Sequence, residues 1–294
     1  MKLAQFPRSR FRATLHFIIP SVCSLAYLFS FSGLIAAEPL AKGIQDNSFF
    51  IEEAYNQEPG VVQHIFNLPI DFTNGAREIA PSFTQEWPVF NQTHQFSYTI
   101  PYVFTEEDNG MEDMRLNYRL QAFMEGKYTP AFAPRLSLVL PTGDSDKGFG
   151  IGVVGYEFNL PFSKIVSDRW TLHFNAGMSV FPKAHQSHHL TNYNIGASAV
   201  YAVSKDFNLM LETLAGWNED VAESVFAFEE TVERSTTAII SPGARYAFNL
   251  PNDAQLVMGV ALPIGLNSDS PDWGMFFYCS FEHAFMRTKA SPTK

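Results

Sequence analysis

The sequence predicts an all-β protein, a transmembrane up-and-down antiparallel β-barrel of about 12 strands. Three observations predict this fold. Hydrophobic and polar residues alternate with a period of two along most of the chain, which is the pattern of strands. The connections between these segments alternate between short and long. Only 49–55, near the start, has some helical character.

The alternation is clearest in 111–123 and is repeated in 168–181. From 113 to 121 one parity of the first stretch carries only polar side chains, namely Asp113, Arg115, Asn117, Arg119 and Gln121. Successive side chains of a strand point to opposite faces, so these five residues share one face. Twelve such segments are expected: 61–72, 82–90, 93–104, 111–123, 132–142, 150–163, 168–181, 192–204, 206–217, 235–249, 254–266 and 275–285. Each is about as long as the 9–11 residues that a tilted membrane-crossing strand needs.

The predicted connections fall into two classes. Short turns are expected at 91–92, 163–167, 205 and 250–253. Long loops are expected at 73–81, 105–110, 143–149, 182–191, 218–234 and 267–274. Short turns at one end and long loops at the other are typical of bacterial outer-membrane barrels. The predicted localisation is therefore the bacterial outer membrane.

Composition excludes several other classes. The 20 Lys and Arg residues against 30 Asp and Glu leave a net charge of −10, which argues against a nucleic-acid partner. The mean hydropathy of −0.06 argues against several membrane-spanning helices, each of which needs about 20 apolar residues. Charged residues make up only 17% and aromatic residues 15%, which argues against a disordered chain.

The N-terminus has the pattern of a secretory signal peptide over residues 1–37. Lys2 and three arginines precede a mostly apolar stretch that ends at Ala36 and Ala37. An N-terminal membrane anchor is the alternative. Cleavage after Ala37 removes four basic and no acidic residues, so the mature chain has 16 basic and 30 acidic residues. Cys279 is then the only cysteine, which leaves no intramolecular disulfide.

The polar parity of the strands favours a barrel lumen over the solvated face of a soluble sandwich. It is rich in small neutral residues and nearly lacks lysine, whereas its cations are arginines, which pair well with carboxylates in crowded surroundings. The lumen-lining candidates are Arg115, Arg119, Arg135, Arg169, Arg245, Asp113, Glu157 and Glu212. No metal site, cofactor or catalytic residue is expected among them.

The last strand is the most specific single feature of the sequence. One parity of 273–285 is almost wholly aromatic or apolar and ends at Phe285. Outer-membrane barrels typically end with such a strand, which the barrel-insertion machinery reads. A polar tail, 286–294, follows it here. The predicted partners are thus this machinery, the lipid bilayer and lipopolysaccharide.

Several stretches carry a family resemblance. "FFIEEAYNQEPGVVQHI" (49–65), "SFTQEWPVF", "HQFSYTIPY", "LNYRLQ", "APRLSLVLPTG" and "HFNAG" resemble the MetA-pathway phenol-degradation family of outer-membrane proteins. The resemblance covers about 48–285. It implies a 12-stranded barrel and the passage of small, including aromatic, compounds, and it assigns no catalytic residues.

The expected function is a passive channel or transporter for small-molecule cargo. A lumen with about five inward arginines and six carboxylates fits a narrow, weakly ion-selective path. Residues 38–60, ahead of the first strand, form either a periplasmic arm or a small plug in the lumen. As a plug, the segment would pair Glu52, Glu53, Gln57 or Glu58 with Arg115 or Arg119.

Two other classes of function remain open, a lipid-hydrolysing outer-membrane enzyme and a non-conducting structural barrel. His185 and Ser187 have the H-x-S spacing of outer-membrane lipid hydrolases, in which His activates Ser. The Asn-Gly that follows H-x-S in those enzymes is replaced by His188 and His189, and a polar loop explains the cluster more simply. The acidic residues of 218–234 either bridge lipopolysaccharide through divalent cations or are solvated.

Overall fold

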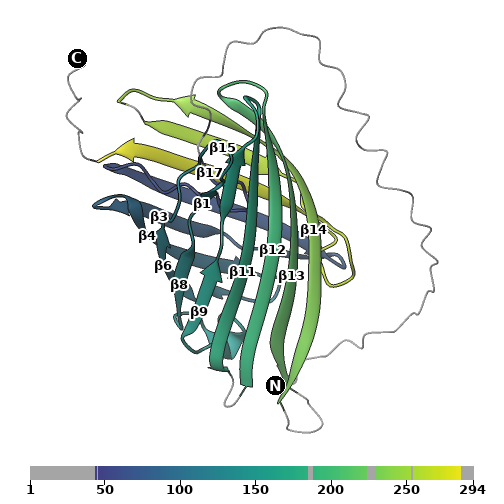
Figure 1. Cartoon of the computed structure of the whole chain (residues 1–294). Helices are drawn as coiled ribbons and strands as arrows, with labels where there is room; N and C mark the ends of the chain where they lie inside the picture. The colour runs from purple at the N-terminus through teal and green to yellow at the C-terminus, as the bar shows by residue number, and fades with distance from the viewer. Residues whose placement is uncertain (1–43, 45, 185–187, 224–229, 253, 286–294) are drawn as a thin grey trace, which may run out of the picture. The chain divides into compact units, whose positions relative to one another are not determined.

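The computed structural model describes residue 44 and residues 46–184, 188–223, 230–252 and 254–285. The predicted signal peptide 1–37 and tail 286–294 lie outside the described residues, as do His185 and Ser187. The described chain is almost entirely strand and irregular connections (Figure 1). Within it, no helix is long and apolar enough to span a membrane.

The strands form one closed antiparallel sheet. Its segments are β1 (Val61–Thr73), β2 (Ala76–Ile79), β3 (Ser82–Val89), β4 (Asn91–Phe104), β5 (Asn109–Met111), β6 (Met114–Leu120), β7 (Ala131–Phe132), β8 (Arg135–Leu140), β9 (Gly155–Asn159), β10 (Phe162–Ile165), β11 (Trp170–Ala184), β12 (His188–Ala202), β13 (Phe207–Glu223), β14 (Glu230–Asn249), β15 (Gln255–Ala261), β16 (Ile264–Gly265) and β17 (Trp273–Ala284). Neighbouring strands of the barrel are neighbours in sequence, and β1 pairs with β17 from Val61↔Ala284 to Phe72↔Trp273. This last pairing closes the barrel and removes both sheet edges.

The 17 segments make a 12-strand barrel because five of the strands are interrupted. β2 and β3 both pair with β1, and β15 and β16 both pair with β14. Proline, which lacks the N–H needed for a ladder hydrogen bond, stands at four of these interruptions. These are Pro81, Pro134, Pro161 and Pro263, and the fifth, between β5 and β6, contains Asp113. The predicted strand number is confirmed.

Three predicted long loops are wrong in extent. In place of 73–81, a two-residue turn at Asn74 and Gly75 joins β1 to β2, with φ of 52° and 86°. Asn-Gly is the preferred pair for such a tight hairpin, since both central residues need positive φ. Much of 182–191 and 218–234 extends strands β11 to β14 instead. The helical character of 49–55 was also misleading, because this stretch is irregular.

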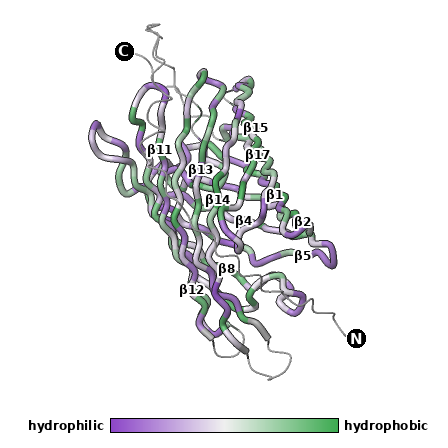
Figure 2. Tube along the Cα trace, turned by 90° about the vertical axis from the view of Figure 1, so that its right-hand side faces the viewer, coloured by the Kyte–Doolittle hydropathy of each residue, from purple (hydrophilic) through white to green (hydrophobic). Residues whose placement is uncertain are grey.

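The two faces of the sheet differ as the alternation predicts. Hydrophilic and hydrophobic residues alternate along the strands (Figure 2). Large apolar residues such as Phe174, Leu211 and Met258 are 45–51% exposed on the outside. Polar residues such as Asn175, Glu212 and Ser280 are at most 4% exposed on the inside. This inside-out distribution is that of a barrel whose outer face contacts lipid.

Candidate functional site

A stretch of residues 46–57, here called the inner segment, lies against the inward-facing side chains of the barrel. Its wall partners include Gln95 of β4, Asn175 of β11 and Glu212 of β13. All three lie in the half of their strand next to the short turns at Phe90, 166–169 and 203–206. We call this the turn end of the barrel. The inner segment thus lies in the half of the lumen nearest the end at which residues 58–60 lead into β1.

Side chains of the wall satisfy the backbone of the inner segment, which pairs with no strand in the described part of the chain. The amide of Glu52 donates to Asn175 Oδ1 at 2.9 Å, and that of Ala54 donates to Ser163 Oγ at 2.7 Å. The amides of Asn56 and Gln57 donate to Gln121 Oε1 at 2.9 Å and Gln95 Oε1 at 2.8 Å. Buried amides need such partners, since an unpaired one costs about 1–3 kcal/mol. The wall is therefore built to hold an irregular peptide.

Glu212 makes the most concentrated of these contacts. Its carboxylate accepts hydrogen bonds from the amides of Phe49, Phe50 and Ile51 at 3.3, 3.0 and 3.2 Å. Three converging N–H groups suit an anion, because hydrogen bonds to a charged acceptor are the stronger kind. The side chain is only 1% exposed. Glu212 therefore holds the middle of the inner segment.

Arg119 holds the C-terminal half of the inner segment. Its guanidinium donates to Asn56 Oδ1 at 2.8 Å, to the Tyr55 carbonyl at 2.7 Å and to the Glu53 carbonyl at 3.2 Å. Arg119 is 3% exposed. The pKa of Glu53, which lies outside the strands, is raised to about 8 by burial and further by Asp46. Burial therefore disfavours the charged form of this carboxyl.

The N-terminal end of the inner segment is held by the opposite wall. Arg245 donates to the carbonyls of Asp46 and Asn47 at 2.9 and 2.6 Å. Asp46 Oδ1 accepts hydrogen bonds from Tyr278 at 2.5 Å and Gln63 at 2.7 Å. The segment is thus fastened at both ends and in the middle.

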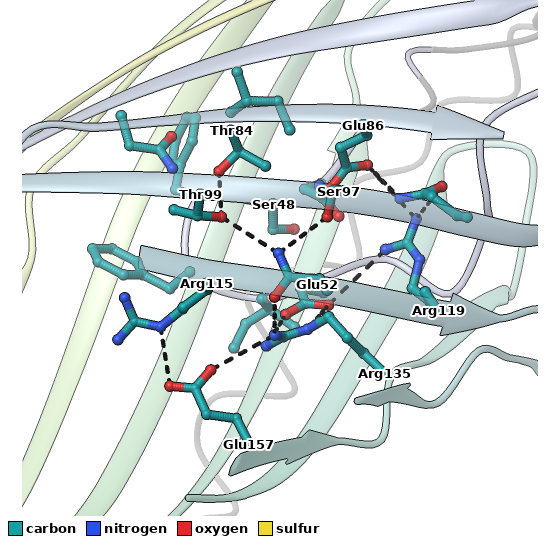
Figure 3. A pocket seen from close by; sticks show the side chains of 18 of the residues that line it. Ser48, Glu52, Thr84, Glu86, Ser97, Thr99, Arg115, Arg119, Arg135 and Glu157 are labelled. Carbon is teal, nitrogen blue, oxygen red and sulfur yellow. Dashed lines mark hydrogen bonds and ion pairs between the residues drawn. The ribbon is translucent and has the colours of Figure 1, made fainter. Parts of the chain in front are cut away.

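Alternating charges run across the lumen beside the inner segment (Figure 3). Arg135 binds Glu52 through two nitrogens, at 2.8 and 3.1 Å, and lies 3.7 Å from Glu157. Glu157 accepts a 3.0 Å hydrogen bond from Arg115. Arg119 lies 4.0 Å from Glu52 and 3.9 Å from Glu86. Three arginines and three glutamates therefore balance one another here.

Two cavities lie on the two sides of this charged row. One, of about 210 Å³, lies between the inner segment and a wall that carries Thr84, Thr99 and Arg115. The other, of about 270 Å³, is lined by Asn175, Ser179 and Asn194. Phe50, Ile51, Glu52, Arg135 and Glu157 line both cavities. These five residues consequently separate the two spaces.

The predicted site residues fall into three groups. The structure brings Arg115, Arg119, Arg135 and Glu157 together, whereas Glu212 and Arg245 contact the inner segment farther along. Asp113 lies instead beneath a folded loop and accepts hydrogen bonds from Gly143 and Ile151. Arg169 lies before β11 and donates to the carbonyls of Ala202 and Val203 at the turn end.

Sequence reasoning missed the neutral residues that hold the inner segment. Gln95, Gln121, Ser163 and Asn175 carry no charge and resemble ordinary lumen lining. The only available signal was their position on the inward parity. In the described part of the chain, no three His, Cys, Asp or Glu side chains gather in a metal-binding arrangement.

A family model described as "Putative MetA-pathway of phenol degradation" matches residues 62–277. The chain belongs to this family. The match spans most of the barrel, from the start of β1 into β17. The resemblance noted in the sequence is thereby confirmed. A comparison with curated proteins finds no match.

Two solved structures of outer-membrane proteins are similar to this family member. An outer membrane channel from Pseudomonas putida F1 is 11% identical with a TM-score of 0.57, covering 78% of this chain and 97% of that one. The NanC porin is 8% identical with a TM-score of 0.46, covering 74% and 98%. At this identity the first likeness supports the fold. Together with the apolar outer face, it makes the chain an outer-membrane β-barrel.

Proposed function

We propose that the protein is a narrow passive channel for small molecules, in which the inner segment acts as a plug that reduces the bore. The observation that carries this proposal is the pair of cavities on the two sides of the charged row. Water-filled space in the lumen is what a permeation path requires. The space in the lumen is divided by Phe50, Ile51 and the Glu52–Arg135 pair, so the path is narrow.

The charge balance of the row supports weak ion selectivity. Arg115, Arg119 and Arg135 face Glu52, Glu86 and Glu157 within one cavity lining. A ring of one sign would favour ions of the other sign, whereas a mixed ring favours neither strongly. Removing one charge from this row should therefore give the channel a preference for cations or for anions.

Single-channel recording of the purified, refolded protein tests the proposal. We expect discrete current steps with a small reversal potential in a salt gradient. Glu157→Gln removes a negative charge and should shift the reversal potential toward anion preference. Arg135→Gln should shift it toward cation preference. Asp168→Asn, an exposed carboxylate at the turn end, is the matched control and should leave it unchanged.

Absence of current steps from folded, heat-modifiable protein would favour the non-conducting barrel. Equal reversal potentials in Glu157→Gln and Arg135→Gln would remove the charged row from the path. The enzyme alternative rests on His185 and Ser187, outside the described residues, and no described observation favours it. We also propose lipopolysaccharide around the outer face and the barrel-insertion machinery as partners, the latter from the aromatic last strand, β17, which Phe285 follows.

A further inference from the structure

We propose that the cavity between the inner segment and the β1–β8 wall is a binding site for a small hydroxy-carboxylate, with Arg115 as the residue that binds its carboxylate. The inference names a substrate class for the proposed channel and rests on that proposed function. It is carried by three features of the cavity: free arginine donors, a pair of threonine hydroxyls and an apolar side.

Arg115 differs from the other two arginines of the row in having donors to spare. Only its Nε is used, in the bond to Glu157, and in Figure 3 this is the one dashed line that leaves Arg115. Among the described residues, neither Nη of Arg115 makes a hydrogen bond. Its side chain is 35% exposed, against 4% for Arg119 and 18% for Arg135. A guanidinium with both Nη groups free offers the paired donors that a carboxylate accepts.

The wall beside Arg115 continues the site across neighbouring strands. Arg115 pairs in register with Thr99, Thr99 with Thr84, and Thr84 with Ile65. The two threonine hydroxyls are 2.8 Å apart and both line the cavity. These residues therefore form an arc from a charged end at β6 to an apolar end at β1.

Thr84 on β3, two strands from Arg115, supplies the second ligand contact. Its hydroxyl is hydrogen-bonded to that of Thr99 and lines the cavity. A hydroxyl can both donate and accept, so this one bond leaves capacity for a ligand hydroxyl. Ile65 and Phe50 line the same cavity and provide apolar contact for the body of the ligand. A carboxylate at one end and a hydroxyl at the other match these two poles.

Glu157 competes with such a ligand for Arg115. The proposal therefore predicts opposite changes in affinity when Glu157 or Arg115 is neutralised. Removing Glu157 frees the Nε and removes a nearby negative charge. Carboxylate binding should therefore become stronger when Glu157 is neutralised and weaker when Arg115 is. A site in which both residues merely support the fold would lose affinity in both variants.

The test is calorimetric titration of the full mature protein in detergent with 4-hydroxybenzoate as the probe. Benzoate lacks the hydroxyl, and 4-hydroxybenzyl alcohol lacks the charge. We expect the affinity for 4-hydroxybenzoate to be higher than that for 4-hydroxybenzyl alcohol by a factor of about ten or more, since the bonds to Arg115 are charge-assisted. Benzoate should bind more weakly than 4-hydroxybenzoate, and Thr84→Val should abolish that difference.

The variants decide between the proposal and its failure. Arg115→Gln should abolish the preference for the acid, Glu157→Gln should strengthen it, and Arg234→Gln at the exposed rim should leave it unchanged. Equal binding of acid and alcohol by the wild type would overturn the proposal. So would weakened acid binding in Glu157→Gln when its gel migration shows a folded barrel. Current steps without carboxylate binding would overturn this inference alone, and binding without current steps would overturn the channel alone.

Discussion

Replacing Glu212 with alanine is expected to release the middle of the inner segment and raise single-channel conductance several-fold. The carboxylate accepts three amides of the segment, and all its hydrogen bonds within the described residues go there. Each such bond to a charged acceptor contributes about 1.5–3 kcal/mol. Because the pairing of the strands does not depend on Glu212, the sheet should still close into a barrel.

Two measurements check this result. Recordings should show larger or more frequent open steps, and limited proteolysis from the turn end should cut within 46–57 in Glu212→Ala faster than in the wild type. Glu212→Gln is the matched control, because its amide oxygen still accepts hydrogen bonds. Its conductance and its rate of cleavage should lie between those of Glu212→Ala and the wild type. Wild-type conductance together with wild-type protection in Glu212→Ala would contradict a role for this anchor.

Replacing Arg119 with alanine is expected to destabilise the protein by about 3–5 kcal/mol, the usual cost of removing one partner from a buried charged network. The guanidinium contacts Asn56, the Tyr55 and Glu53 carbonyls and Gln95, and it also lies near two glutamates. Removal leaves these acceptors and carboxylates without their donor. The measurement is the free energy of unfolding in urea with the protein reconstituted in lipid.

A double-mutant cycle separates the electrostatic part of this loss. Neutralising Glu86 in the Arg119→Ala background should restore part of the stability, because the unpaired buried charge is removed. Arg119→Lys keeps the charge but not the planar guanidinium that reaches several acceptors at once. Its free energy of unfolding should therefore lie between those of the wild type and Arg119→Ala. An Arg119→Ala protein within about 0.5 kcal/mol of the wild type, as for an ordinary surface change, would show that the contacts are not maintained.

The strand pattern was predictable because alternate side chains of each strand contact lipid and face the lumen, so apolar and polar residues alternate in the sequence. The segment 61–72 was placed within one residue of β1, and the inward parity of 111–123 correctly paired Arg115 with Arg119 on one face. The Asn74–Gly75 turn was also readable, since Asn-Gly between two strand patterns is a strong hairpin signal. The alternation of short and long connections predicts a long loop at 73–81 because it takes no account of this Asn-Gly pair.

The path of the inner segment could not be read from the sequence. Its anchors come from many strands, with Glu212 more than 160 residues from Phe50. Neutral side chains such as Gln121 and Asn175 show no signature that separates a peptide anchor from ordinary lumen lining. The sequence predicts Arg115 or Arg119 as the partner of Glu52; Arg119 lies 4.0 Å from Glu52, but the bidentate partner is Arg135 on β8. Which arginine reaches the segment depends on the three-dimensional curvature of the wall.

The most direct test of the account is single-channel conductance with the inner segment locked in place. Ser48 Oγ and Ser198 Oγ are 2.7 Å apart, so Ser48→Cys with Ser198→Cys, in a Cys279→Ser background, should form a disulfide. We predict a small, steady conductance in the oxidised protein and a larger or fluctuating conductance, as in the wild type, after reduction. Identical conductance before and after reduction, with the cross-link verified by mass spectrometry, would contradict the claim that the inner segment controls the bore.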